Sequence, residues 1–258
     1  MNQSVREVKD NNPDLKTERR LHRRFYKAIA DYRLIEDGDK ILIGLSGGKD
    51  SLCLVELLGK KKRINHPSFE VEAVHVRMEN IHYESDTTYL SDFCRSWDIP
   101  LHVVTTAFDL STDKRKSPCF LCSWNRRKQM FNLAQEQHFN KIALGHHMDD
   151  ILHTTLMNQF FQGHFSTMPV RLKMRKMPLT IIRPLCLEAE ADIRHYAEMK
   201  GYVGQKKTCP YEKDSYRSAI KHIFEEAERL NPDVRHSIWN ALESDNKLIE
   251  DENEAGSV

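Results

Sequence analysis

The 258-residue chain lacks the segments that mark membrane or secreted proteins. It has no run of eighteen apolar residues, so no transmembrane helix is expected. The opening stretch MNQSVREVKDNNPDLK has no apolar signal core. Cysteine is also scarce. Six cysteines in a chain of this length do not indicate a disulfide scaffold. We therefore expect a cytoplasmic protein, in which paired cysteines more often mean metal or redox chemistry.

An excess of charge of one sign is equally absent. Lys and Arg number 39 and Asp and Glu number 38, which leaves a formal net charge of +1 although charged residues make up 30% of the chain. Overall charge therefore gives no indication of a nucleic-acid partner, and local clusters have to decide. The chain shows no internal repeat and no low-complexity tract, and its length suits one large domain with extensions.

What the sequence does contain is a regular alternation of strand and helix patterns. Continuous apolar runs, typical of strands buried on both faces, alternate with helical spacing. The expected strands are 40–46, 70–76, 101–106, 141–145 and 179–185, and the expected helices are 51–63, 85–97, 123–137, 148–163 and 188–201. This alternation predicts an α/β fold with a doubly wound parallel sheet.

Extensions flank the alternating region on both sides. Residues 15–36 have helical spacing with many Arg and Lys residues, and the chain ends in the acidic stretch EDENEAGSV, for which we expect disorder. We therefore divide the chain into an N-terminal basic helical extension (1–36), the α/β domain (37–200) and a C-terminal segment with helices and an acidic tail (201–258).

Unusual residues follow the strands at the edge where such sheets bind ligands, outside the carboxyl ends of the strands. They are SGGKDS after the first strand, His75 at the end of the second, Cys119 and Cys122 after the third, GHHMDD after the fourth and Arg183 at the end of the fifth. Their coincidence on one rim predicts an enzyme.

The stretch SGGKDS has the composition of an anion-binding loop. Ser46, Gly47 and Gly48 let the backbone turn tightly and approach an anion with no side chain in the way. The following helix offers free N–H groups and a positive dipole end, and Ser51 adds a hydroxyl. The common nucleotide loop requires Ser or Thr after Gly-Lys, where this chain has Asp50. A turn that uses its glycines for geometry alone is the alternative.

Cys119 and Cys122 stand three apart in PCFLCSWNRRK, a spacing that places both on one face of a helical turn. Cys209 is a distant third candidate. Three thiolates could hold a 4Fe–4S cluster and leave one iron without a protein ligand, although four is the normal count. A redox dithiol, a structural zinc site, which normally needs four ligands, and an inert pair are alternatives. The remaining cysteines have apolar surroundings and are expected in the core: Cys53, Cys94 and Cys186.

In this order, SGGKDS, CFLCSWNRRK, LGHHMDD and IIRPL resemble the motifs of the tRNA 2-thiocytidine synthetase family, a branch of the PP-loop ATP pyrophosphatase superfamily. The similarity covers most of the chain. It implies an adenine nucleotide alpha hydrolase-like fold and ATP-dependent replacement of the C2 oxygen of cytidine 32 in tRNA by sulfur, with formation of AMP and pyrophosphate. It also implies a 4Fe–4S cluster on Cys119, Cys122 and Cys209, a sulfur donor such as a cysteine desulfurase or sulfide, and a homodimer.

The candidate site residues fall into two groups. The residues expected to bind ATP and its Mg²⁺ are Ser46, Gly47, Gly48, Lys49, Asp50, Ser51, His75, Gly145 and Arg183. Those expected in catalysis are Asp50, Arg126 and Asp150. Arg126 would stabilise negative charge that develops near the phosphates, and Asp150 would hold the metal or orient a group. His147 would either transfer a proton or serve in capping or packing, and His75 could be a mere strand-end residue.

Two positions depart from the family pattern. Trp124 stands where the family usually has a basic residue, directly after CxLCS. Around Cys209 the chain reads TCPYEKDSYR, which is closer to the CPYS segment of tRNA 2-thiouridine synthetases, although their terminal cysteine pairs are missing. A 2-thiouridine synthetase is therefore one alternative. Another adenylating enzyme, such as a tRNA lysidine synthetase, and a non-catalytic RNA-binding module with a metal or cluster are others.

Several basic clusters flank the expected rim. They lie at 19–24, 60–63, 114–116, 126–128, 171–176 and 206–207. One charge run is usually a solvated face, but several around one rim favour an RNA partner. For the target base in the anticodon loop to react, it would have to be unstacked and turned into the pocket.

Overall fold

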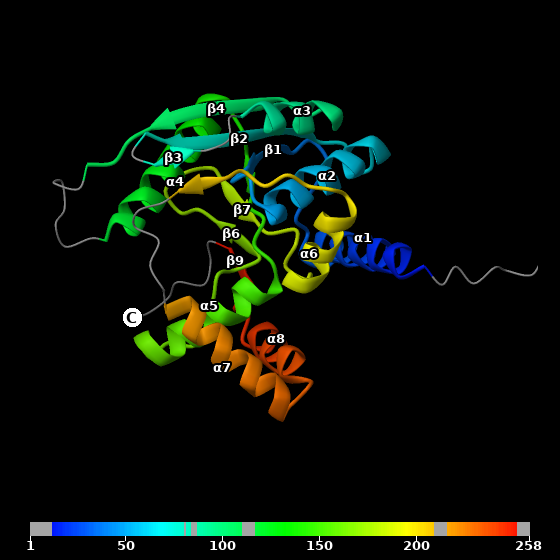
Figure 1. Cartoon of the computed structure of the whole chain (residues 1–258), viewed down its shortest axis with the longest axis vertical. Coiled ribbons are helices and arrows are strands. Elements are labelled where there is room, and N and C mark those ends of the chain that lie inside the picture. The colour runs from blue at the N-terminus through cyan, green and yellow to red at the C-terminus, as the bar shows by residue number, and fades with distance from the viewer. Residues whose placement is uncertain (1–11, 80, 84–86, 110–116, 209–215, 252–258) are drawn as a thin grey trace, which may run out of the picture.

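The computed structural model describes residues 12–79, 81–83, 87–109, 117–208 and 216–251, and all structural statements concern these residues. The elements, in chain order (Figure 1), are α1 (Pro13–Asp31), β1 (Lys40–Gly44), α2 (Lys49–Ile64), β2 (Glu70–Met78), β3 (His82–Tyr83), α3 (Thr88–Ser96), β4 (Leu101–Thr106), α4 (Pro118–Glu136), β5 (Lys141–Ala143), α5 (Met148–Gln162), β6 (Arg171–Lys173), β7 (Thr180–Ile182), α6 (Glu190–Met199), β8 (Lys207–Thr208), α7 (Tyr216–Leu230), α8 (Val234–Ser244) and β9 (Ile249–Glu250). Among the described helices, none combines the length and apolarity that a membrane crossing requires.

Seven strands form the main sheet in the order β4-β2-β1-β5-β7-β6-β9. The five strands predicted from the sequence correspond to β1, β2, β4, β5 and β7, and they pair in parallel. Because the chain builds outward in both directions from β1, the predicted doubly wound parallel sheet is confirmed. β6 adds an antiparallel strand between the predicted helix 148–163 and the predicted strand 179–185, where no strand was expected, and β9 pairs in parallel with β6.

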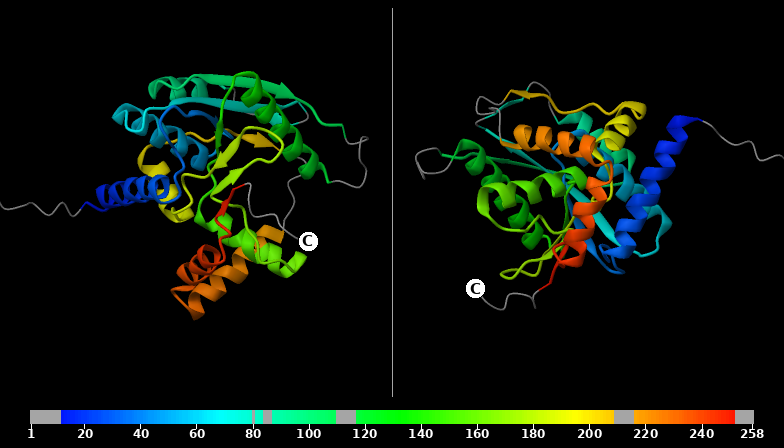
Figure 2. Two further views of the ribbon diagram at one scale, coloured as in Figure 1. Left: turned by 180° about the vertical axis from the view of Figure 1, so that it is seen from behind. Right: turned by 90° about the horizontal axis from the view of Figure 1, so that it is seen from below.

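Side chains of β1 alternate between two hydrophobic cores. Ile41 and Ile43 belong to the larger core, which includes buried residues of α1, α2 and α6. Leu42 points to the opposite face and packs with Met130 and Ala134 of α4. The sheet is thus covered by helices on both faces, as Figures 1 and 2 show.

The two extensions pack on this framework. α1 lies against α6, while α7 and α8 lie against α5 at the far end of the sheet from α3 (Figures 1 and 2). Phe25 of α1 and Trp239 of α8 are buried in the same core as β1. The predicted disorder of the acidic stretch is wrong at its start, because Glu250 belongs to β9 and Asp251 accepts a hydrogen bond from Arg171. The rest of that stretch, 252–258, lies outside the described residues.

Several helix and strand boundaries differ from those predicted, and two of the differences concern the cysteine pair and His75. α4 begins at Pro118 rather than at residue 123, because Ser117 caps it by accepting a hydrogen bond from the Phe120 backbone N–H at 3.2 Å. β2 continues to Met78, so His75 lies within the strand and not at its end. The three cysteines predicted to be core residues are buried as expected: Cys53, Cys94 and Cys186.

Candidate functional site

The SGGKDS stretch forms a tight turn between β1 and α2. Gly47 has φ +84°, a left-handed conformation that favours glycine. The Gly48 backbone N–H donates to Ser46 Oγ at 3.3 Å, and the Ser51 hydroxyl donates to the Gly48 carbonyl at 2.9 Å. Gly48 is the N-cap of α2, and no side chain caps the N–H groups of its first turn. The turn therefore presents backbone donors and a helix N-terminus toward an anion.

Two segments that are distant in sequence approach this turn closely. A Cβ atom at Gly145 would lie 3.1 Å from backbone atoms of Asp50 and Ser51. A Cβ atom at Gly47 would lie 2.7 Å from Cβ of Gln205, whose backbone N–H donates to the Gly47 carbonyl at 2.9 Å. Both glycines are thus required by close packing. The sequence analysis missed Gln205, which belongs to no recognisable motif.

Carboxylates from two helices meet at His147. His147 is 6% exposed and is the N-cap of α5, and its Nε2 lies 4.0 Å from Asp50 Oδ1 and 3.5 Å from Asp150 Oδ2. The His147 backbone N–H donates to Asp150 at 3.2 Å, so the Asp150 carboxylate caps this end of the helix. Two carboxylates facing one space beside the turn are the protein ligands that Mg²⁺ commonly uses with phosphate oxygens.

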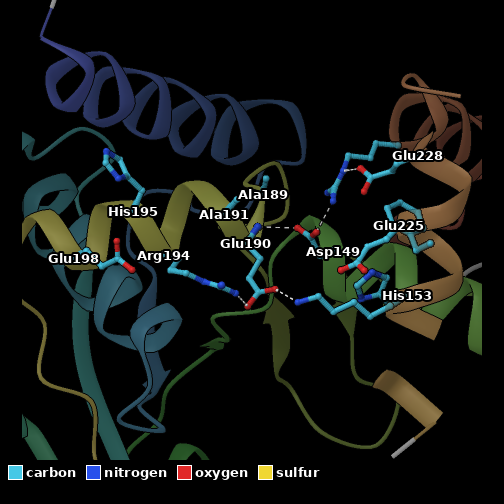
Figure 3. A pocket seen from close by; sticks show the side chains of 13 residues that line it. Asp149, His153, Ala189, Glu190, Ala191, Arg194, His195, Glu198, Glu225 and Glu228 are labelled. Atoms are coloured by element: carbon cyan, nitrogen blue, oxygen red, sulfur yellow. Dashed lines mark hydrogen bonds and ion pairs between the residues drawn. The ribbon is translucent and has the colours of Figure 1, made fainter. Parts of the chain in front are cut away.

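Lys49 is held by an acidic residue that the sequence analysis did not identify. Its Nζ lies 3.2 Å from Asp50 Oδ1 and 3.3 Å from Oε1 of Glu190, which follows 141 residues later in the sequence. Glu190 opens α6 and also accepts hydrogen bonds from Arg194 at 2.9 Å and Lys221 at 3.2 Å (Figure 3). Burial raises the pKa of Glu190, but the bonds from Arg194 and Lys221 outweigh it and lower the pKa to about 2.

The other aspartate of GHHMDD has a structural role. Asp149 is buried and accepts hydrogen bonds from the Glu190 backbone N–H and from Arg235, both at 2.8 Å. These bonds join α5, α6 and α8 along a pocket of about 400 Å³, which Figure 3 shows with its charged lining. Burial opposes ionisation of Asp149, but the bonds from Arg235 and from the Glu190 backbone lower its pKa. Asp150 is left to face the turn.

His75 is fully buried, and its Nδ1 lies 2.7 Å from the Leu45 carbonyl oxygen at the end of β1. Burial lowers the pKa of His75, and the positive charges of Arg126 and Arg77 lower it further. His75 is therefore neutral at neutral pH. Arg126 of α4 is therefore close enough to His75 for its charge to lower this pKa.

Arg183 follows β7 directly, whereas the predicted strand continued to residue 185, and it is 7% exposed. It donates a hydrogen bond to the Pro169 carbonyl, while its Nε has no hydrogen-bond partner within the described part of the chain. Burial and the charge of Arg127 lower the pKa of Arg183 to about 10, so it still carries its charge at neutral pH.

The cysteine pair lies in the first turns of α4. Cys119 is exposed, and Cys122 is half-buried against a small apolar cluster that contains Met78 and Ile81. Cys209, the third predicted ligand, lies outside the described residues, within which no three potential metal ligands converge. Its predecessor Thr208 pairs with His82 in the two-stranded sheet of β3 and β8. His82 directly follows Ile81, a member of the apolar cluster that Cys122 contacts.

Residues of two predicted basic clusters form ion pairs with acidic residues of the same chain. Arg20 and Arg24 of α1 form ion pairs with Asp192. In the next cluster, Lys60 forms ion pairs with Glu18 at 3.2 Å and Glu56 at 2.8 Å. The cluster 114–116 lies outside the described residues. The cluster 126–128 is carried by α4, beside the cysteine pair.

The fold and the turn together define a class of protein, the PP-loop ATP-binding proteins, and the model of the PP-loop domain family matches residues 15–222. The tRNA-cytidine(32) 2-sulfurtransferase of Pelobacter propionicus is 35% identical over 230 residues, 87% of this chain and 85% of the relative. The tRNA-cytidine(32) 2-sulfurtransferase 1 of Francisella tularensis subsp. tularensis is 33% identical over 242 residues, 90% of each chain. The chain belongs to this family of tRNA sulfurtransferases.

A solved structure confirms the fold. The U34-tRNA thiolase NcsA from Methanococcus maripaludis, determined with its 4Fe–4S cluster, superimposes with a TM-score of 0.73 over 93% of this chain and 82% of that chain. The two sequences are 24% identical. The resemblance to the tRNA 2-thiocytidine synthetase family that the motifs indicated is thus confirmed by sequence relatives, and the fold class by structure.

Proposed function

We propose that this protein converts cytidine 32 of tRNA to 2-thiocytidine in a reaction that consumes ATP and forms AMP and pyrophosphate. The observation that carries the proposal is that the anion-binding turn and the cysteine pair lie at the same edge of the sheet. The SGGKDS turn, which we call the pyrophosphate turn, follows β1. His75 of β2 contacts the Leu45 carbonyl at the end of β1, and the charge of Arg126 on α4 lowers the pKa of His75. The same helix carries Cys119 and Cys122 in its first turns.

The chemistry explains why such a site needs both parts. Oxide cannot leave the C2 position of a pyrimidine. The C2 oxygen therefore attacks the α-phosphorus of ATP, and the bond to the β-phosphate breaks to release pyrophosphate. A sulfide sulfur then forms a bond to C2, and the carbon–oxygen bond breaks to release AMP. Holding the base, ATP and sulfur in reacting geometry supplies much of the rate enhancement.

The residues of the turn suit the first step. Ser46, Gly48 and the first turn of α2 would bind the departing pyrophosphate through N–H and O–H groups. Asp50 and Asp150 would hold Mg²⁺, because one oxygen of each carboxylate lies within 4.0 Å of His147 Nε2 and the two ligands would leave the other positions to phosphate oxygens. Arg126, Lys49 and Arg183 are the cations we assign to charge on the nucleotide.

The cysteines suit an iron–sulfur cluster. Cys119 and Cys122 lie three apart in the first turns of α4, and the β3–β8 pairing carries the chain to Thr208, next to Cys209 in the sequence. We propose these three residues as the ligands. When bound, a 4Fe–4S cluster with three protein ligands supplies one iron at which sulfide can bind. Leu121 packs the cysteine turn on the sheet and so fixes its position.

Further elements of the proposal concern partners and organisation. We propose tRNA as the substrate, a cysteine desulfurase or free sulfide as the sulfur source, a homodimer as the assembly and the cytoplasm as the location. We also propose the division into 1–36, 37–200 and 201–258. Support for the location comes from the exposed Cys119 thiol, which suits a reducing compartment.

The test is thiolation by the anaerobically reconstituted protein, supplied with ATP, Mg²⁺, sulfide and unmodified tRNA, followed by nucleoside analysis. We expect 2-thiocytidine at position 32. Asp50→Asn should lower the rate about 100-fold or more, because a metal ligand is lost. Cys119→Ser should remove iron and activity together, while the buried control Cys94→Ala should keep its iron.

Other results of this assay would favour one of the alternative functions. A 2-thiouridine product would favour the alternative that the CPY segment after Thr208 suggests. Release of AMP without any thionucleoside, unchanged in Cys119→Ser, would favour a different adenylating enzyme. Normal tRNA binding with no ATP turnover would favour a non-catalytic RNA-binding module.

A further inference from the structure

Helix α4 carries two side-chain stripes on neighbouring faces. Cys119, Cys122 and Arg126 are spaced at i, i+3 and i+7, which places them on one face. Phe120, Trp124 and Lys128 are spaced at i, i+4 and i+8 on the next face around the helix. The first stripe belongs to the site already described. The second has no role in the adenylation or sulfur chemistry.

The aromatic members of the second stripe are in contact with solvent. Trp124 is 51% exposed and Phe120 is 48% exposed. The other two tryptophans of the chain serve the core, since Trp239 is 6% exposed and Trp97 is half-buried against the main cluster. α4 is anchored on its opposite side by buried residues such as Met130, so the exposure of Trp124 is fixed by the fold.

The charge around Trp124 suits a polyanion. Lys128 Nζ lies 5.3 Å from the centre of the Trp124 ring, and Arg127 is exposed in the same turn. α4 contains no carboxylate before Glu136. An exposed indole with cations beside it is the arrangement that binds single-stranded nucleic acid, since bases stack on the ring and cations meet the phosphates.

The position of Trp124 sets which nucleotide it can reach. With a rise of about 1.5 Å per residue, Trp124 lies about 3 Å beyond Cys122 and about 7.5 Å beyond Cys119 along the helix axis. At this short separation along the helix, a base on Trp124 belongs to a nucleotide that neighbours the base presented to the cysteines.

We propose that Trp124 is a stacking platform for the anticodon-loop nucleotide that flanks the target cytidine, and that Arg127 and Lys128 bind its phosphate. This inference rests on the proposed tRNA thiolation. It also gives a function to the residue that stands where the family usually has a basic side chain. Trp124 is here a substrate-positioning residue, because it holds the neighbour of the reacting base.

The experiment uses the reconstituted full-length protein and a 17-nucleotide anticodon stem–loop RNA, with 2-aminopurine placed at one loop position at a time. We expect quenching at the positions next to 32 with wild type and none with Trp124→Ala. Trp124→Ala should weaken RNA binding by about 5- to 150-fold and raise KM for tRNA, with kcat changed less. Trp124→Phe should keep most of the affinity, because it keeps an aromatic ring.

Phe160→Ala is the matched control, because Phe160 is an exposed aromatic residue on another helix, α5, at 57% exposure. It should bind RNA within about twofold of wild type. Wild-type affinity, quenching and KM in Trp124→Ala would overturn the inference while leaving thiolation intact. Trp124-dependent quenching in a protein that makes no 2-thiocytidine would instead overturn the proposed function and keep the stacking site.

Discussion

Replacing Gly145 with alanine tests the contact on which the geometry of the pyrophosphate turn depends. The added Cβ would lie 3.1 Å from Asp50 C and O and from Ser51 N. Contacts of carbon with heavy atoms are most favourable at about 3.5–4.0 Å, so the methyl group needs several tenths of an ångström. All three neighbours are backbone atoms of the first turn of α2, which cannot rotate away as a long side chain would.

Both stability and activity should therefore change. Overpacking of this kind costs about 1–3 kcal/mol in the free energy of unfolding. For a chain of this length the melting temperature falls by about 2–4 °C per kcal/mol, so a decrease of about 2–12 °C is expected. Because a misplacement of about 1 Å can cost about 100-fold in rate, a shift of Asp50 by several tenths should lower thiolation about 3- to 30-fold.

The assays are a thermal unfolding curve, ATP affinity and the rate of 2-thiocytidine formation for Gly145→Ala. Gly204→Ala is the matched control, since its Cβ would lie 3.8 Å from the Gly47 carbonyl oxygen, an ordinary contact beside the same turn. The control should behave as wild type. Wild-type stability and rate in Gly145→Ala would refute the reasoning, and equal losses in both variants would show that the turn rejects any added methyl.

Two further predictions concern buried charges. Burial raises the pKa of Glu188 to about 8, whereas the unfolded carboxyl titrates near 4.5, so its contribution to stability is full below pH 4.5 and lost as pH rises through 8. In urea unfolding from pH 5 to 8, the free energy of unfolding should decline by up to about 1.4 kcal/mol per pH unit, and Glu188→Gln should reduce this decline. Parallel plots of the free energy of unfolding against pH for wild type and variant would contradict this. Arg235→Met removes a hydrogen bond from buried Asp149 and should lower the free energy of unfolding by about 1.5–3 kcal/mol. Arg95→Met breaks only an exposed ion pair and should cost under about 1 kcal/mol, so similar losses in the two variants would argue against the buried pair.

Local sequence patterns were sufficient for the central sheet and for the rim. Apolar runs predicted each of the five parallel strands, because strands buried on both faces need such runs. The turn after β1 and the GHHMDD stretch after β5 were then placed together by the geometry of parallel sheets alone. Asp50 and Asp150 accordingly meet at His147.

The contacts that the sequence did not predict join segments with no shared pattern. Glu190 reaches Lys49 and Gln205 covers Gly47 only because α6 and the following segment fold back over the turn. Strand β6 has only three residues, which is too short for an alternation of side chains to be recognised. His75 was misplaced because a strand boundary carries a weaker signal than a strand interior. Asp50 and Asp150, by contrast, could be predicted without knowing these tertiary contacts or strand boundaries.

The pairing of β6 with β9 has a consequence for synthesis of the protein. Arg171 of β6 pairs with Ile249 of β9, so one edge of β6 stays open until Ile249, 78 residues later, has been added. At about 5–20 residues per second, roughly 4–15 s separate the two strands on the ribosome. An open strand edge can recruit other chains, and short length and charged side chains protect against this. β6 has both features, with Arg171 and Lys173 on either side of one leucine. Its sequence therefore protects the open edge during the interval before β9 is synthesised.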